Sequence, residues 1–334
     1  MLRMRAVWYE RTGAAHDVLQ FGEMDRPQPE AGEVLVRIAY SGVNPSDVKR
    51  RAGTRTQGYA PPRIVPNMDG SGVVVAVGEG VDRKRIGERV WLHSTAWKRP
   101  FGTAAEYATT PSQRAIPLPD GVPLKVGAAL GVPALTAHRA VHGCGDVAGR
   151  TVLVTGGAGA VGLYAIQLAK RAGARVIATA RGSEKLELVR QAGAEAAIDY
   201  TTEPVAQRIA SICGTVDHVV DVDFAANLAT TLAVLAPHGS IATYASMSDP
   251  EPRIPFYSMM TMNLRLLWVF VYELHADTIA SAAFDVNAWL ASGTAVHRFA
   301  QTYPLQRAAD AHVAVEQAAF GKVVIEVAGE NAGA

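Results

Sequence analysis

Apolar and polar positions alternate in short runs at the start of the chain and change to longer, helix-spaced runs after about residue 124. Apolar or alternating runs at 34–40, 72–77 and 89–92 are separated by clusters of Gly, Pro, Asn and Asp, a pattern typical of strands joined by turns. From 151 onward, strand-like and helix-like runs alternate. The predicted strands are 151–155, 175–179, 196–200, 216–222, 240–245 and 264–271, with helices near 161–172, 183–192, 204–212 and 225–236. This spacing favours right-handed βαβ units and a doubly wound parallel sheet.

The segment beyond this alternating region predicts a return to the first domain. A helix near 276–292 ends at Gly293, and a strand at 296–303, a helix from 305 and a strand at 322–327 follow. A chain of 334 residues also exceeds what one hydrophobic core usually supports. We therefore predict an α/β protein of two domains. A β-rich domain covers 1–124 and is completed by 294–334, and a Rossmann domain covers 125–293.

A glycine-rich turn joins the first strand of the alternating region to its first helix. The run 151–155 leads into Gly157, Gly159 and Gly162, and a helical pattern follows at once. Backbone amides at a helix start carry partial positive charge, and glycines let a pyrophosphate approach them closely. Because a strand and a helix flank the turn, we predict a dinucleotide site here rather than a turn that binds nothing. Its contacts would include Ala160 and Val161.

The end of the second predicted strand bears on the choice of dinucleotide. NAD-selective domains place a carboxylate there for the ribose 2′-hydroxyl, but here Ala180 is followed by Arg181-Gly-Ser-Glu-Lys185. With no carboxylate at 180, nothing is expected to repel a 2′-phosphate, and Arg181, Ser183 and Lys185 can donate to it. Ser183 is also a natural helix N-cap, and Lys185 could be a solvated surface charge. Two charge-assisted hydrogen bonds can change affinity by about a hundredfold or more, so we predict a preference of at least that order for NADPH over NADH.

Charge and cysteine content exclude several classes of partner. Thirty-two basic and thirty-one acidic residues leave a formal charge of +1, which gives no drive toward nucleic acid or anionic membranes. Two cysteines are too few for a disulfide framework. The first eight residues lack the apolar run of a signal peptide, and 264–272 is far shorter than a membrane span. We expect a cytoplasmic protein.

Several short motifs, in order along nearly the whole chain, carry a family resemblance. They are Ser41-Gly-Val-Asn-Pro-Ser-Asp47, Asp69-Gly-Ser-Gly-Val73, Ala76-Val-Gly78, Gly102-Thr-Ala-Ala-Glu-Tyr107, Leu135-Thr-Ala-His-Arg-Ala140, the glycine turn and Gly321-Lys-Val-Val324. Together they resemble the zinc-free medium-chain dehydrogenase/reductases of the quinone oxidoreductase (zeta-crystallin-like) group. The resemblance implies that the first domain is GroES-like, that the cofactor is NADPH and that the protein is a homodimer or a higher assembly.

The same resemblance implies site residues. It places Asn44 and Asp47 near the nicotinamide ribose and substrate, and His138 and Tyr244 along the cofactor. Besides Tyr244, the resemblance implies cofactor contacts at Tyr200, Ala245, Val271 and Lys322. The structural alternatives stay open: Asn-Pro-Ser-Asp is a good turn sequence, and His138 could be either a proton donor at neutral pH or a structural histidine.

Zinc ligands expected of the metal-dependent relatives are missing from the sequence. Asn44 stands where those relatives carry the first cysteine, and Asn67-Met68-Asp69 stands in place of their Gly-His-Glu run. His138, His142 and Cys144 form a rival cluster, which also fits an ordinary helix end. We expect no metal.

These observations favour metal-independent hydride transfer from NADPH to a quinone, a small apolar substrate. The alternative is NADPH-dependent reduction of the activated C=C bond of an alkenal, enone or enoyl thioester. A purely binding or RNA-binding role is disfavoured by the near-zero charge. The segment 246–262, rich in Met and aromatic residues, could rim a substrate cleft, pack a dimer or belong to the core.

Overall fold

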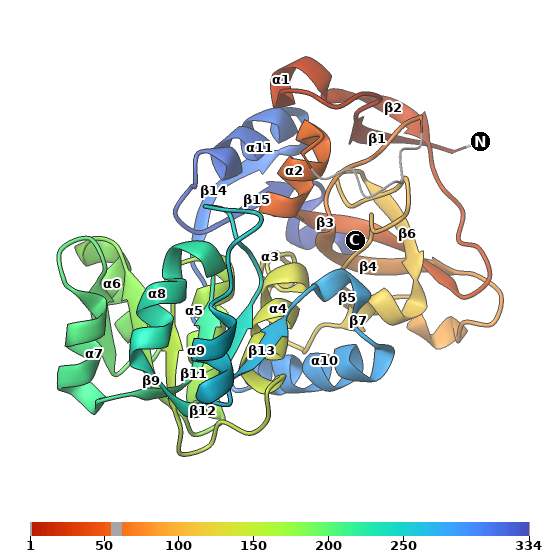
Figure 1. The fold of residues 1–334 in the computed structure, drawn as a ribbon. Coiled ribbons are helices and arrows are strands. Elements are labelled where there is room, and N and C mark those ends of the chain that lie inside the picture. Colours follow the sequence, from red (N-terminus) through yellow and green to blue (C-terminus); the bar gives the residue numbers. More distant parts are fainter. Residues whose placement is uncertain (1, 55–61, 334) are drawn as a thin grey trace. The chain divides into compact units, whose positions relative to one another are not determined.

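The computed structural model describes residues 2–54 and 62–333, whose contacts gather into two units (Figure 1). The first unit comprises Met1–Val132, Asn287–Gly293 and Arg298–Ala334, and the second comprises Pro133–Val286 and Thr294–His297. The units follow from contacts alone, so the functional domain limits given above stay predictions.

The first unit is built around a mostly antiparallel sheet that the chain enters twice, in which only the pairing of β14 with β15 is parallel among the strands that the structure describes. Its strands follow the order β14-β15-β3-β4-β5-β7, with β6 also pairing β3, and β1 and β2 form a separate hairpin. The elements are β1 (Arg3–Trp8), α1 (Ala15–Val18), β2 (Gln20–Asp25), β3 (Glu33–Val43), α2 (Pro45–Ala52), β4 (Asp69–Val77), β5 (Arg89–Leu92), β6 (Tyr107–Pro111), β7 (Ala115–Pro117), α3 (Leu124–Gly127), β14 (Phe299–Pro304), α11 (Ala308–Glu316) and β15 (Lys322–Glu326). The β-rich first part agrees with the predicted fold class, and β14 and β15 join its sheet late in the chain.

The late strand β15 is central to what this unit positions. It pairs antiparallel with β3, with Val323 opposite Val43, and its residues 322–325 are buried. The pairing brings Lys322, far along the sequence, beside the loop that follows β3. Strand periodicity and sheet register therefore determine where this lysine lies.

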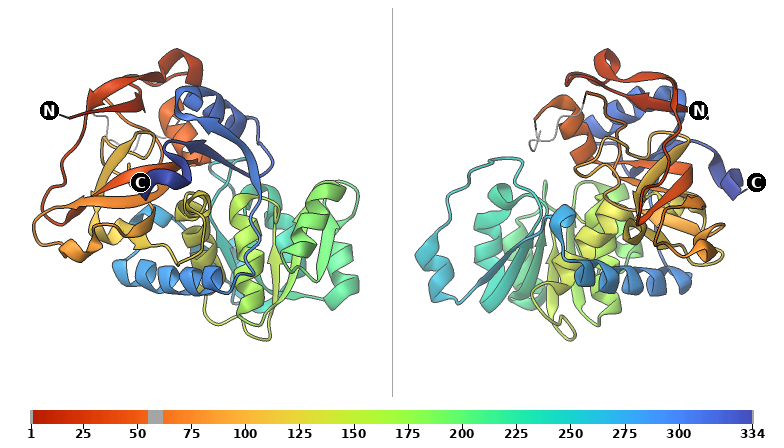
Figure 2. Two further views of the ribbon diagram at one scale, coloured as in Figure 1. Left: turned by 180° about the vertical axis from the view of Figure 1, so that it is seen from behind. Right: turned by 90° about the vertical axis from the view of Figure 1, so that its right-hand side faces the viewer.

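The second unit is a six-stranded parallel sheet of order β10-β9-β8-β11-β12-β13. Figure 2 shows these strands side by side, with helices packed along the sheet. The elements are α4 (Gly131–His142, which starts in the first unit), β8 (Thr151–Val154), α5 (Ala160–Arg171), β9 (Arg175–Ala180), α6 (Ser183–Gln191), β10 (Ala196–Asp199), α7 (Val205–Cys213), β11 (Val216–Asp221), α8 (Phe224–Val234), β12 (Leu235–Thr243), α9 (Phe256–Thr261), β13 (Arg265–Trp268) and α10 (Ala276–Ala291, which ends in the first unit). The strand order reverses between β8 and β11, which is the topological switch point of a doubly wound fold. The predicted α/β class, with a Rossmann sheet, is confirmed.

Two predicted elements are shorter in the structure. The strand expected at 264–271 is limited to β13, since Val271–Glu273 turns into a 3-10 helix. The helix expected from Leu305 opens with a 3-10 turn at Leu305–Arg307 and becomes α-helical at Ala308, a common form of helix start. Within residues 2–54 and 62–333, none of the helices has both the length and the apolar character that crossing a membrane requires.

Candidate active site

The glycine turn leads from β8 into α5 at the switch point of the sheet. Gly157 donates its amide to the Thr179 carbonyl at 2.8 Å. A Cβ atom on Gly157 would lie 2.9 Å from the Ile166 side chain, and one on Gly162 would lie 2.5 Å from the Gly156 carbonyl oxygen. Only glycine fits the close backbone approach at 162, whereas a side chain at 157 would require the Ile166 side chain to shift. The first-turn amides of α5 are therefore presented at the carboxyl edge of the sheet, as an anion site needs.

A cavity of about 550 Å³ opens at this same edge. Its lining comes from the ends of several strands and from α7 and α8, and includes Thr155, Gly156, Thr179, Tyr200, Val222 and Asn227. Its size is that of a typical small-molecule or cofactor pocket. Its position, outside the carboxyl ends of parallel strands at a switch point, is where open α/β sheets bind ligands.

The residues predicted to hold a 2′-phosphate follow β9. Arg181 and Ser183 are exposed and Lys185 is half-buried, while Tyr200 is 51% exposed and lines the cavity. Ser183 does not cap α6, as one alternative had it. The N-cap is Gly182, which has a φ of 80° that favours glycine, and Ser183 is the first residue of the helix.

A carboxylate that the sequence analysis missed lies beside this turn. Asp199 ends β10 and pairs in register with Ala180 of β9. Its Oδ2 accepts the Gly182 amide at 2.9 Å. Although no carboxylate stands at 180, one therefore lies beside the residues predicted to hold a 2′-phosphate, because the acid comes from the neighbouring strand. Only the strand register reveals it.

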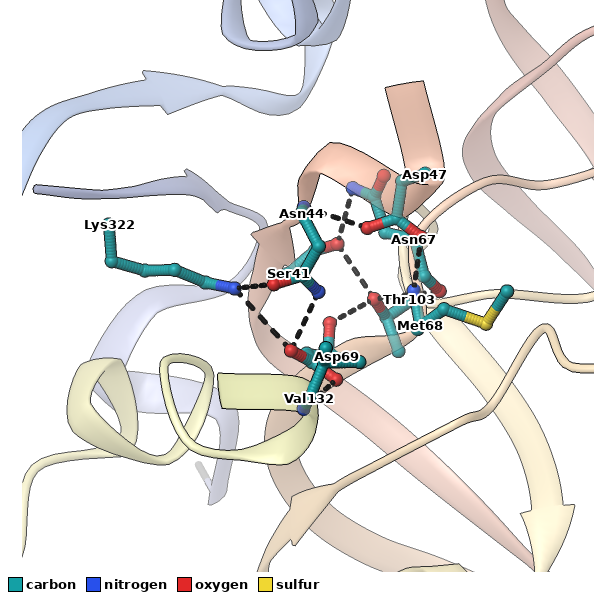
Figure 3. Close-up of polar contacts among 9 residues, drawn as sticks. All are labelled: Ser41, Asn44, Asp47, Asn67, Met68, Asp69, Thr103, Val132 and Lys322. Carbon is teal, nitrogen blue, oxygen red and sulfur yellow. Dashed lines mark hydrogen bonds and ion pairs between the residues drawn. The ribbon is translucent and has the colours of Figure 1, made fainter. Parts of the chain in front are cut away.

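The first unit holds a buried polar group, the Asp69 cluster, made of Asn44, Asp47, Asp69 and Lys322 (Figure 3). Asn44 donates Nδ2 to Asp69 Oδ2 at 2.7 Å and accepts Lys322 Nζ at its Oδ1 at 2.5 Å. Lys322 Nζ also lies 3.4 Å from Asp69 Oδ2. Asp47 accepts the Asn44 amide at 2.8 Å and the Met68 amide at 3.1 Å. The structure thus brings together three of the residues predicted from the sequence and adds Asp69.

Two glycines make room for this cluster. A Cβ atom on Gly42 would lie 3.0 Å from Lys322 Cε and 2.0 Å from the Ala128 carbonyl oxygen. One on Gly131 would lie 2.1 Å from Asp69 Oδ1, which accepts the Val132 amide at 2.9 Å. The α4 start and β3 therefore approach the charged groups only because these positions lack side chains.

Burial controls the ionisation of the cluster. Desolvation, followed by repulsion from Asp69, raises the pKa of Asp47 to about 7. Desolvation also raises the pKa of Asp69, against the opposing pull of the Lys322 ammonium, and it lowers the pKa of Lys322. A buried cation and two buried carboxylates share one site, so the ionisation of each depends on the charges of the others.

A second series of hydrogen-bonded side chains lies next to the cluster. Ser41 Oγ bonds Thr103 Oγ1 at 2.7 Å and accepts Asn67 Nδ2 at 2.9 Å, and Asn67 Oδ1 accepts His312 Nε2 at 3.0 Å. Burial lowers the pKa of His312 to about 3, so its ring is neutral. Sequence reasoning missed this series, because its members come from distant segments.

The remaining candidates have local partners. His138 Nε2 lies 2.8 Å from Asp285 Oδ2 of α10, and its ring lies 4.6 Å from that of His142. Burial raises the pKa of Tyr244, which follows β12, and the next residue, Ala245, accepts the Phe224 amide through its carbonyl. Val271 is buried at the start of its 3-10 turn. The structure ties His138 to α10 and leaves its predicted catalytic role a prediction.

No cluster of three or more His, Cys, Asp or Glu side chains that could hold a metal ion occurs in the part of the chain that the structure describes. The histidine pair of α4 instead packs ring against ring, with Asp285 beside it.

Comparisons with known proteins match both halves of the chain. Residues 30–120 match the family model described as the alcohol dehydrogenase GroES-like domain, and 160–286 match the zinc-binding dehydrogenase model. The quinone oxidoreductase of Rattus norvegicus is 30% identical to this chain over 92% of it and 93% of its own length. This chain belongs to the quinone oxidoreductase family of medium-chain dehydrogenase/reductases. The predicted family is thereby confirmed, and the protein is an oxidoreductase.

Two further members of this wider group are informative. A mycobacterial protein solved in complex with NADPH is 30% identical, with a TM-score of 0.84 over 97% of this chain and 99% of its own. The NADPH-dependent alkenal/one oxidoreductase of Arabidopsis thaliana is 35% identical over 54% of this chain and 48% of its own length. Quinone and alkene reductases are thus both similar to this chain.

Proposed function

We propose that this family member is an NADPH-dependent quinone oxidoreductase that works without a catalytic metal. The observation that carries the proposal is the carboxyl edge of the Rossmann sheet, where the glycine turn, the 550 Å³ cavity and the exposed Arg181 lie on one unit. The NADPH complex of the similar mycobacterial protein and the quinone oxidoreductase relatives support it.

The residues present fit NADPH. Apart from its chain neighbours, the one described atom within 4 Å of a Cβ built on Gly159 is the Gly156 carbonyl oxygen, at 3.3 Å. A pyrophosphate therefore has space to approach the α5 amides. Arg181 and Ser183 would hold the 2′-phosphate, and Tyr200 would flank the adenosine. When bound, NADPH supplies the hydride.

The Asp69 cluster would contact the nicotinamide end of NADPH, from which the hydride is transferred. Asn44 uses its amide nitrogen on Asp69 and its oxygen on Lys322, so its orientation is fixed. Lys322 has three N–H donors, and its hydrogen bonds to Asn44 and Asp69 use two. We assign Asn44 and Lys322 to binding the nicotinamide ribose, and the Lys322 ammonium to stabilising negative charge on the acceptor oxygen as hydride arrives. Asp47 would hold Asn44 and the Met68 backbone in place.

The test is turnover of purified, chelator-treated protein, followed by the loss of reduced-nicotinamide absorbance. A benzoquinone, an enone and an acyl-CoA ester are compared side by side. We expect turnover with the quinone that chelation does not diminish. Loss of activity on chelation that zinc restores would contradict metal independence. If none of the three acceptors supports NADPH oxidation, the enzymatic proposal is contradicted.

Reduction of an activated C=C bond is the second candidate, because a similar Arabidopsis enzyme is named for it. This reaction needs a positioned acid. The raised pKa of Tyr244 keeps its hydroxyl protonated, which makes it a donor candidate beside His138. Faster turnover of the enone than of the quinone would select this function.

We also propose that the protein forms a homodimer through the β13 edge of its Rossmann sheet. Among the strands that the structure describes, β13 pairs only with β12. Phe256, Tyr257 and Trp268 nearby are 64%, 75% and 58% exposed. A free strand edge beside exposed aromatics is a self-pairing surface. A monomer in sedimentation velocity, at the concentrations used for assay, would contradict this.

A further inference from the structure

Asp199 is held in one orientation by a complete set of hydrogen bonds. Oδ2 accepts the Gly182 amide at 2.9 Å, and Oδ1 accepts the Thr201 amide at 3.0 Å and the Thr201 hydroxyl at 2.6 Å. Its own amide donates to Glu203 Oε1 at 2.9 Å. The carboxylate is therefore a fixed part of the β9–α6 turn rather than a mobile surface charge.

The charge of this carboxylate persists at neutral pH. The hydrogen bonds from Thr201 and Gly182, with the nearby Arg181, hold the pKa of Asp199 below its ordinary value. Glu203 lies on the same side, and its pKa is likewise lowered, first by the Asp199 amide and also by Arg208. The charged groups of the turn and of the first turn of α6 are Arg181, Glu184 and Lys185, and the Asp199 carboxylate is hydrogen-bonded to the turn itself.

This arrangement affects a 2′-phosphate in two ways. A phosphate bound by Arg181 would lie in the field of a fixed negative charge, which weakens its binding. The Gly182 amide, which could otherwise donate to the phosphate, is already used by Asp199. A 2′-hydroxyl carries no charge, so the negative charge of Asp199 does not weaken its binding in this way.

We propose that Asp199 is a specificity-determining residue of the cofactor site, and that its carboxylate reduces the preference for NADPH over NADH that Arg181 and Ser183 create. The inference rests on the proposed function, since it assumes a nicotinamide dinucleotide at this edge of the sheet. The proposal lowers the NADPH preference of at least a hundredfold that the sequence predicted. That prediction considered only position 180 and did not include the Asp199 carboxylate.

The experiment compares wild type with Asp199→Asn. An asparagine keeps an oxygen for the Gly182 amide and removes the charge. We expect the ratio of kcat/KM for NADPH to that for NADH to rise by about tenfold, mostly through a lower KM for NADPH. Asp217→Asn is the matched control, since Asp217 also accepts a strand amide, that of Thr151, at 2.8 Å but lies among the amino-terminal strand ends. It should leave the ratio unchanged.

Calorimetric titration with NADP⁺ and NAD⁺ separates the inference from the function it rests on. Tighter NADP⁺ binding by Asp199→Asn, with NAD⁺ binding changed little, supports the inference. Binding of both dinucleotides with an unchanged or lower ratio overturns it and leaves the proposed function standing. If wild type binds neither, both fail. Should Asp199→Asn not fold, Asp199→Ser removes the same charge and must shift the ratio in the same direction, or the inference is wrong.

Discussion

The Asp69 cluster and the β9–α6 turn are two polar regions that differ in burial: the first is enclosed by protein and the second is exposed to solvent. Asp69 is 0% exposed and Lys322 5%, and none of the described side-chain N or O atoms of the cluster is buried without a hydrogen-bond partner. In the turn, Arg181, Gly182 and Ser183 are exposed. A buried ion must find its partners within the protein, because water is excluded. An exposed hydrogen-bond donor can be solvated by water until a ligand binds. Substitutions should therefore cost stability in the first region and cofactor affinity in the second.

Removing the cation of the cluster should have the largest effect. In Lys322→Met, Asp69 and Asp47 remain buried without their countercharge, so we expect a loss on the order of 3–5 kcal/mol in the free energy of unfolding, measured by urea denaturation. Lys125→Met is the control, as Lys125 is half-buried and its amine lies 4.9 Å from the Phe299 ring centroid. A Lys322→Met variant as stable as the control would contradict the assignment of Lys322 as the countercharge.

The pH dependence of stability should change when Asp47 is neutralised. Its pKa rises from 3.8 in the unfolded chain to about 7 in the fold, so the native state binds more protons than the unfolded state between these values. This group therefore makes stability fall as pH rises from about 4 to 7. Asp47→Asn should flatten that part of the profile by on the order of a few kcal/mol.

The matched control for this titration is Asp25→Asn. Asp25 pairs with Arg3 on the exposed hairpin, so its removal should leave the profile between pH 4 and 7 as in wild type. If the Asp47 variant and wild type lose stability in parallel over this range, Asp47 is not the group that titrates.

Substitution in the turn should act on the cofactor instead. For Arg181→Ala we expect kcat/KM with NADPH to fall by about tenfold or more, because a charge-assisted hydrogen bond is lost, with little change for NADH or for the melting temperature. Arg190→Ala, at the far end of α6 and paired with Glu187, is the control. An equal loss with both cofactors would show that Arg181 does not contact the 2′-phosphate.

His138→Phe should have the smallest effect on catalysis. His138 is buried and paired with Asp285, so we expect about 1–2 kcal/mol of lost stability and an unchanged kcat with a quinone. A drop in kcat confined to the enone would instead assign the proton-donor role to this histidine.

The sequence predicted those parts of the fold that depend on local pattern. Strand and helix alternation indicated the Rossmann sheet, and the Gly157–Gly162 spacing placed the turn between β8 and α5. Asp199 was missed because it acts on Gly182 across a strand pair, and single-sequence patterns do not give register. The His312–Asn67 contact joins residues 245 positions apart and leaves no local signal. Lys322 was named through family resemblance, but its partners Asn44 and Asp69 emerged only from the pairing of β15 with β3.

That pairing also sets an order of events during synthesis. Asn44 and Asp69 leave the ribosome early, whereas β15 and its lysine follow only after the whole Rossmann sheet has been translated. Until then the carboxylates of Asp47 and Asp69 have no ammonium to offset them, and burying them is unfavourable. The first unit therefore has an electrostatic reason to stay open until Lys322 arrives, so folding of the nascent chain is expected to finish with its N-terminal segment and not to begin there.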